Sequence, residues 1–156
     1  MKALNSRRGT SASTRVLVDT SFLLPAVGLD VEEEVYDAIK HFHKVEICYI
    51  EASILEIMWK IVKLVPESEM NIVRIGIEAI RSTYTLITPG ALAFSEAYSL
   101  YHEAHKDLID NLLYAVSYEQ KIPLLTIDQG FIQALKLHGR DISNIITPET
   151  FVKTFK

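Results

Sequence analysis

The segment 15–19, with the sequence RVLVD, constrains the fold more than any other part of the chain. Its valines and leucine follow one another without polar alternation, which is typical of a parallel strand buried on both faces. Such a strand needs helices on both sides of its sheet. It also ends in Asp19. An ionised carboxylate is poorly solvated at that place and therefore needs a positive charge nearby. The sequence therefore predicts a central strand with a charged group at its end.

Strands and helices are predicted to alternate along the rest of the chain. Further strands are expected at residues 45–50, 85–88, 123–127 and 145–146. Helices are expected at residues 22–26, 31–43, 51–65, 66–82, 91–105, 107–120, 129–138 and 148–155. This alternation predicts an α/β fold, a three-layer α/β/α domain with a mainly parallel sheet. Residues 15–156 are expected to form that single domain, and residues 1–14 a disordered, basic tail.

The composition of the chain limits the kinds of protein, membrane-spanning, secreted or cytoplasmic, that it can be. Hydrophobic residues make up 49% of the chain, but no apolar run approaches the roughly 18 residues of a membrane span. The tail lacks the apolar core of a signal peptide, and the single cysteine, Cys48, has no partner for a disulfide. These features favour a cytoplasmic protein. The apolar excess, concentrated in the helix at 51–65, predicts a homodimer.

Two aspartates follow predicted strands. Asp19 ends the first strand and Asp128 follows the strand at 123–127. In open α/β sheets, ligands bind at the carboxyl ends of the strands, so these two side chains are candidates for a functional site. Each also has a structural interpretation, because an aspartate commonly caps the helix that follows it.

The helix at 51–65 carries a third candidate, Glu56. Apolar residues surround Glu56 on most of the helix circumference, so we expect this helix to be buried on more than one side. Lys60 lies four residues later, where it forms a favourable ion pair with Glu56 in the structural interpretation. Glu51 is a rival to Glu56, and the two are too far apart in helical rotation to share one face.

The helix at 107–120 begins with two further acids. Asp107 and Asp110 are three residues apart and therefore face the same side. Both suit the helix dipole, and Asp107 has the position of a cap. Asp110 lies deeper, between apolar pairs. His102 and His105 could form a metal pair in principle, but without an evident third ligand a surface location is the favoured interpretation.

Considered together, the acids predict a metal site. Carboxylates gathered at strand ends repel one another and raise each other's pKa values unless a cation lies among them. Oxygen ligands without cysteine or histidine select hard cations, here Mg²⁺ or Mn²⁺. Such a cation lowers the pKa of bound water and stabilises charge on a phosphate oxygen.

The ordered set of motifs resembles the PIN-domain family, and within it the toxins of VapC-type toxin–antitoxin pairs. The motifs are DTS at 19–21, a helical Glu56, DNLLYA at 110–115 and LLTIDQGF at 124–131. The last stretch is the most specific, and the resemblance extends from residue 15 to about residue 151. It implies four metal-binding and catalytic acids, Asp19, Glu56, Asp110 and Asp128. It also implies supporting hydroxyls on Ser21 and Thr126; Asp107 joins them as a supporting acid.

The resemblance implies a metal-dependent endoribonuclease that hydrolyses RNA phosphodiester bonds and forms dimers, with an antitoxin as a candidate partner. The formal net charge of −4 is unusual for an RNA-binding chain, so cations and a local basic rim are expected to offset it. The candidates for that rim are Lys60, Lys63, Lys106, Arg140 and the tail of residues 1–14. One alternative is a catalytically weak module of the same fold that binds RNA or a partner protein. Another is a phosphoacceptor receiver domain, which would need paired acids where Thr20 and Ser21 follow Asp19.

Overall fold

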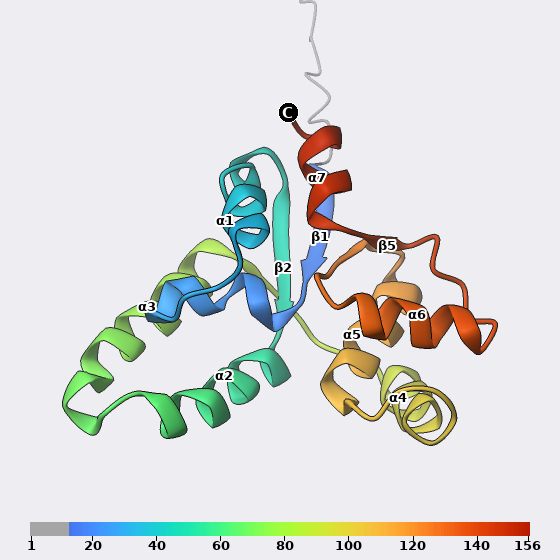
Figure 1. The fold of residues 1–156 in the computed structure, drawn as a ribbon, viewed down its shortest axis with the longest axis horizontal. Coiled ribbons are helices and arrows are strands. Elements are labelled where there is room, and N and C mark those ends of the chain that lie inside the picture. The colour runs from blue at the N-terminus through green and yellow to red at the C-terminus, as the bar shows by residue number, and fades with distance from the viewer. Residues whose placement is uncertain (1–12) are drawn as a thin grey trace, which may run out of the picture.

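The computed structural model describes residues 13–156, and its sheet consists of five parallel strands (Figure 1). These are β1 (Arg15–Val18), β2 (Glu46–Ile50), β3 (Thr85–Ile87), β4 (Leu124–Leu125) and β5 (Ile145–Ile146). Their order is β3-β2-β1-β4-β5, and each neighbouring pair is parallel. The predicted α/β class and the central place of β1 are confirmed. The predicted tail, residues 1–14, lies outside the described residues except for its last two.

Helices connect successive strands. They are α1 (Glu33–Ile39), α2 (Glu51–Leu64), α3 (Met70–Thr83), α4 (Ala91–Glu103), α5 (Leu108–Gln120), α6 (Gln129–Leu137) and α7 (Pro148–Thr154). Short 3-10 helices are η1 (Thr20–Phe22), η2 (Leu24–Val27), η3 (Phe42–Lys44) and η4 (Glu67–Glu69). Within residues 13–156, no helix combines the length and the apolar character that crossing a bilayer requires.

Two hydrophobic cores lie on opposite faces of the sheet. Val16 and Val18 of β1 belong to the core that also contains buried residues of α1, α2, α3 and α7. Leu17, between them, points to the core formed with α4, α5 and α6. Successive side chains of a strand face opposite ways, so the uninterrupted apolar run serves both cores. The three-layer α/β/α arrangement predicted from the sequence is confirmed (Figure 1).

The topology brings the segments that follow the strands to one edge of the sheet. All strands are parallel, so their carboxyl ends share that edge. Figure 1 shows the arrowheads of β1 and β2 pointing toward the side where α2 lies. The helix α2 begins directly after β2, and it packs against η1 and α5. Residues far apart in the sequence therefore meet at this edge.

Several element boundaries differ from the prediction. The strand expected at 123–127 is shorter, β4 being Leu124–Leu125. The backbone of Pro123 and Thr126 still hydrogen-bonds to Leu17 and Ile146, whereas the N–H group of Ile127 donates to the Asp19 side chain. The helix expected at 22–26 is replaced by the 3-10 helices η1 and η2. The helices expected at 31–43 and 66–82 are each divided into an α-helix and a 3-10 helix.

The helix α2 buries one side only. Ser53, Ile54, Ile57 and Ile61 are buried, whereas Leu55, Trp59 and Val62 are more than half exposed. Within this single chain, the expectation that α2 is buried on more than one side is wrong. A second apolar face of α2 remains at the surface, and we call Leu55, Trp59 and Val62 the exposed α2 face.

Candidate active site

Asp19 is fixed between two strands. It is 5% exposed and caps η1, where Oδ1 accepts a hydrogen bond from the N–H of Ser21 at 2.8 Å. Its Oδ2 accepts from the N–H of Ile127, beyond β4, at 3.2 Å. Burial raises the pKa of Asp19, while hydrogen bonds from Thr126, Ser21 and Ile127 act in the opposite direction. The capping interpretation is thus correct for this residue, and the same carboxylate joins β1 to the segment after β4.

Glu56 reaches the same region from α2. Its Oε2 accepts a 2.6 Å hydrogen bond from the hydroxyl of Thr20, and its Oε1 lies 3.2 Å from Nζ of Lys60. The predicted ion pair with Lys60 is confirmed. Glu51 forms an ion pair with Arg81 of α3 instead, which separates it from this cluster. Of the two rival glutamates, Glu56 is the one that lies with the other acids.

The start of α5 carries Asp107 and Asp110. Oδ1 of Asp107 accepts from the N–H groups of Ile109 and Asp110 at 2.9 and 3.1 Å, so Asp107 is the helix cap. The Asp110 side chain is 20% exposed. Burial, followed by repulsion from nearby carboxylates, raises the pKa of Asp110 to about 8. The repelling carboxylates are those of Asp107, Asp19, Asp128 and Glu56.

Asp128 caps α6 in the way that the structural interpretation predicted. Its Oδ1 accepts from the N–H of Phe131 at 2.8 Å. Its own N–H donates to the hydroxyl oxygen of Thr126 at 3.1 Å. Thr126 therefore supports both strand-end aspartates, because its hydroxyl also hydrogen-bonds to Asp19. The cap fixes the direction of Asp128 at the sheet edge.

The structure brings together all the predicted acids except the rival Glu51, and it adds a histidine. One ligand atom from each of His105, Asp110 and Asp128 lies within 4.8 Å of the others. For His102 and His105 the sequence analysis favoured a surface location over a metal pair, and the His102 ring packs against Tyr98 and Tyr101. For His105 that interpretation is wrong, because its side chain lies against Asp110 and Asp128, which the histidine spacing did not indicate.

Thr20 is a second residue that the sequence analysis missed. The resemblance pointed to Ser21 as the helper hydroxyl of the DTS motif. In the structure the Thr20 hydroxyl, 4% exposed, holds Glu56, whereas Ser21 contacts Asp19. The pairing with Glu56 spans 36 residues and depends on the packing of α2 against η1. Local sequence contains no signal for it.

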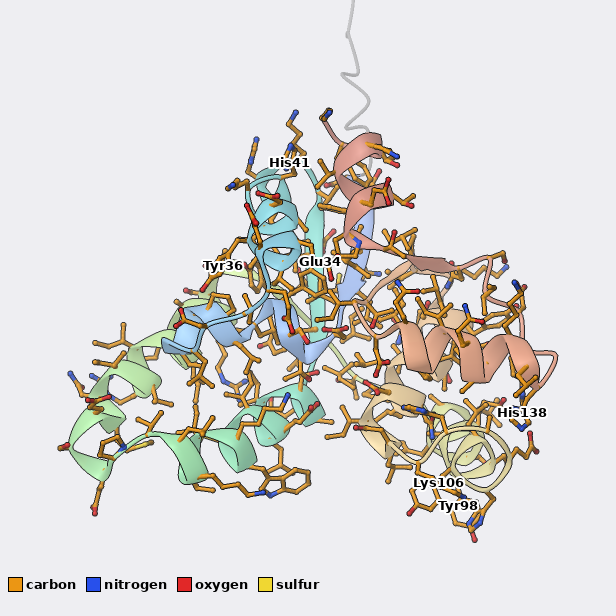
Figure 2. All side chains as sticks on the ribbon, viewed as in Figure 1. Glu34, Tyr36, His41, Tyr98, Lys106 and His138 are labelled. Atoms are coloured by element: carbon orange, nitrogen blue, oxygen red, sulfur yellow. The ribbon has the colours of Figure 1, made fainter. Side chains whose placement is uncertain are left out.

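The predicted basic rim is only partly near the acids. Lys60 contacts Glu56, as described above. Lys106 lies near α4 (Figure 2). Its Nζ donates to the carbonyl of Tyr101 at 2.6 Å and lies over the Tyr101 ring. Arg140 is paired with Glu96 and Glu103. Of these three cations, Lys60 is the one in direct contact with the acidic cluster.

The donor set fits a divalent cation. Several carboxylates share a partly buried space, where burial and then their mutual repulsion raise the pKa of Asp110 to about 8. A cation would relieve this repulsion, and carboxylate oxygens are the ligands that Mg²⁺ and Mn²⁺ prefer. The chemistry and the crowding of these side chains are therefore those of a metal-binding site.

The fold and this cluster together define an α/β/α domain with an acidic site at the carboxyl edge of a parallel sheet. The family model for the PIN domain matches residues 16–136, and the chain belongs to this family. PIN domains are nucleases, so the predicted family and its enzyme class agree with this match. No curated protein is similar enough in sequence to match the chain.

Solved structures share the fold at low sequence identity. A toxin–antitoxin complex from Klebsiella pneumoniae has a TM-score of 0.61 at 17% identity, covering 85% of this chain and 97% of that chain. A crystal structure from Pyrobaculum aerophilum has a TM-score of 0.60 at 19% identity, covering 94% and 98%. A VapC toxin from Mycobacterium tuberculosis, described as cleaving the sarcin–ricin loop, has a TM-score of 0.56 at 17% identity, covering 76% and 94%. These similarities establish the fold.

Proposed function

We propose that this chain is a divalent-metal-dependent endoribonuclease that hydrolyses phosphodiester bonds of RNA. The observation that carries the proposal is the convergence of four acids from separate segments on one edge of the sheet. Burial, followed by repulsion from the other carboxylates, raises the pKa of Asp110 to about 8, as expected where these acids lie close together. In this proposal Asp19, Glu56, Asp110 and Asp128 hold Mg²⁺ or Mn²⁺ and form the catalytic set.

Bound there, a divalent cation supplies Lewis acidity and a nucleophilic water at neutral pH. The chain's own residues hold the ligands in place. Two backbone N–H groups fix Asp19, and the Thr20 hydroxyl fixes Glu56. Ser21 and Thr126 act as supporting hydroxyls around Asp19. Asp107 supports Asp110 indirectly, by capping the first turn of α5 that carries it.

The RNA substrate must approach an acidic site on a chain of net charge −4. Bound cations offset the acids, and Lys60 at the edge of the cluster can exchange its contact with Glu56 for a phosphate. The structure from Mycobacterium tuberculosis is described as a sarcin–ricin loop cleaving toxin. This description supports a toxin role for this chain, and the cytoplasm is its proposed location.

Two protein partners belong to this proposal. The exposed α2 face supports a homodimer, because a surface of this kind is normally covered. An antitoxin is the second proposed partner, supported by the description of the similar structure from Klebsiella pneumoniae as a toxin–antitoxin complex. The proposed nuclease domain comprises residues 15–156.

The test compares two glutamates on the same helix. Glu56→Gln should reduce Mn²⁺-dependent cleavage of single-stranded RNA at least about a hundredfold, the upper end of effects seen on changing a metal shell. Glu51→Gln, which removes only the exposed pair with Arg81, should cut like the wild type. Chelator should abolish all cleavage. Equal cutting by both variants, purified identically to exclude a contaminating nuclease, would remove this proposal.

Asp19→Asn should also abolish cutting, because an amide cannot supply the charge that a hard cation needs. Both Asp19 oxygens accept backbone N–H groups, so the amide nitrogen would face one of these donors. Melting curves must therefore show that this variant is folded. Metal binding by a folded wild type that leaves RNA intact would favour the alternative, a binding module of the same fold.

A further inference from the structure

His105 lies against the acidic cluster although it is not one of the four predicted acids. It follows the end of α4 and precedes the cap of α5 by two residues. Its Nε2 lies 3.1 Å from Oδ2 of Asp110, and both side chains are 20% exposed. With Asp128 added, the three ligand atoms lie within 4.8 Å of one another. The site therefore contains a nitrogen donor among its oxygens.

The imidazole is held in this position from two sides. Its ring packs on Phe131 of α6, with ring centroids 4.7 Å apart. The backbone of His105 is also held. Its carbonyl accepts a hydrogen bond from Nδ2 of Asn111 in α5 at 2.8 Å, and its backbone N–H donates to the carbonyl of Leu100 in α4 at 3.0 Å. The elements that fix the ring are thus the helices that carry Asp110 and Asp128. A donor held in advance loses little conformational freedom when it binds.

We propose that His105 is a further ligand of the metal in this site and that it turns the preference of the site from Mg²⁺ toward Mn²⁺. This inference rests on the proposed function, because it requires that the acids bind metal. Neighbouring ligand atoms around a six-coordinate ion with bonds of about 2.1 Å lie about 3 Å apart. In the chain without metal, Nε2 of His105 and Oδ2 of Asp110 are joined by a hydrogen bond of 3.1 Å, so the two atoms already lie at that separation and a bound cation would replace the bond.

The expected selectivity follows from the nitrogen atom. Mg²⁺ binds oxygen ligands and retains much of its water, whereas imidazole favours transition metals. Mn²⁺ accepts both kinds of ligand. A site that consisted only of carboxylates would have little preference for Mn²⁺ over Mg²⁺, and one imidazole ligand would increase its preference for Mn²⁺. The ratio of the two affinities is therefore the quantity that reports on His105.

A purely structural role is the competing explanation, and His102 provides the matched control. His102 lies three residues earlier, is exposed, and its ring contacts Tyr98 and Tyr101 rather than any acid. Removing either histidine takes away one imidazole from the same region of the chain. If His105 has only a structural role, its loss should weaken the binding of both cations equally. If His105 is a ligand, its loss should weaken the binding of Mn²⁺ selectively.

Calorimetric titration of the full chain with Mn²⁺ and Mg²⁺ measures this ratio. His105→Gln should lose at least about tenfold in Mn²⁺ affinity and less than about threefold in Mg²⁺ affinity. His102→Gln should bind both cations like the wild type. Equal losses for both cations in His105→Gln, or an unchanged ratio, would overturn the inference.

Pulsed electron paramagnetic resonance tests the same contact without a substitution. Bound Mn²⁺ should show nitrogen coupling in the wild type, and the coupling pattern should change when histidine is labelled with ¹⁵N. Mn²⁺ that binds without nitrogen coupling would refute the ligand role of His105 while leaving the proposed function standing. A wild type that binds neither cation would instead refute the proposed function, and this inference with it.

Discussion

The hydroxyl of Thr20 donates a 2.6 Å hydrogen bond to Oε2 of Glu56, joining the end of β1 to a helix 36 residues further along the chain. Thr20 is 4% exposed, so the bond lies away from bulk water. It holds one oxygen of Glu56, the glutamate among the proposed ligands, while the other oxygen lies 3.2 Å from Nζ of Lys60. Asp19, by contrast, is fixed by backbone donors.

Thr20→Val should therefore reduce RNA cleavage by about tenfold, because it keeps the shape of the side chain and removes the bond to Glu56. Thr20→Ser keeps the hydroxyl and should therefore retain most of the wild-type activity. Loss of one hydrogen bond should cost about 1 kcal/mol of folding free energy in Thr20→Val. Cleavage rates at saturating Mn²⁺, together with urea unfolding, measure both effects. Full activity in Thr20→Val would show that Glu56 needs no such support.

The sequence predicted the parts of the site that follow from local pattern. Asp19 and Asp128 were placed by the apolar strands before them, and the sheet topology then brought them together. The bond between Thr20 and Glu56 and the contact of His105 with Asp110 could not be predicted in this way. Both depend on how helices pack, and packing is decided by side-chain shape over the whole domain rather than by spacing along one element.

The same distinction explains the errors in the boundaries. The run PLLTI at 123–127 has strand character throughout, yet β4 consists of Leu124 and Leu125, although the backbone of Pro123 and Thr126 also hydrogen-bonds to the neighbouring strands. The N–H group of Ile127 donates to the side chain of Asp19, more than a hundred residues earlier. The Asp19 carboxylate thus replaces a neighbouring strand as the partner at this end of the run. The cost of an unpaired strand end is offset by the hydrogen bond to Asp19.

The metal-free protein should lose stability as the pH rises. The pKa of Asp110 is about 8 in the folded chain, against about 3.9 for an aspartate in an unfolded chain. Between these values the folded state binds more protons, so the free energy of unfolding falls with rising pH, by at most about 1.4 kcal/mol per pH unit for one proton. Asp110→Asn should flatten this dependence. Burial also raises the pKa of Asp19, which accounts for the slope that remains.

Urea unfolding in chelator at several values between about pH 5 and pH 8 measures that slope. Saturating Mn²⁺ should abolish this slope in the wild type, because the bound cation keeps Asp110 ionised, as it is in the unfolded chain over the same pH range. An equal slope in the wild type and in Asp110→Asn would contradict the assignment of this titration to Asp110.

The proposed homodimer should depend on the exposed α2 face. Val62 is 70% exposed, so Val62→Lys should leave the fold intact while introducing a charge that an apolar interface cannot bury at low cost. Leu137→Lys on α6 is the control, because Leu137 is 83% exposed on a different helix. Analytical ultracentrifugation should show a dimer for the wild type and the control, and a shift toward monomer for Val62→Lys. A wild type that stays monomeric at micromolar concentrations would refute the homodimer.

Asp128 has two roles in the structure, and they can be separated. Its Oδ1 caps α6 through the N–H of Phe131, and its charge contributes to the raised pKa of Asp110. Asparagine caps a helix about as well as aspartate but carries no charge, whereas alanine removes both properties. The two substitutions therefore form a matched pair, in which only the cap differs.

In chelator, Asp128→Asn should be at least as stable as the wild type, because one of the repelling charges is gone and the cap to Phe131 remains. Asp128→Ala should be less stable than Asp128→Asn by about 1 kcal/mol, the usual value of a cap. Excess Mn²⁺, at a hundred times its dissociation constant, should stabilise the wild type by about 2.7 kcal/mol. Both variants should lose most of that gain, because each lacks a carboxylate ligand. Thermal melting with chelator and with Mn²⁺ measures all three proteins, and an undiminished gain in Asp128→Asn would leave Asp128 as a cap alone.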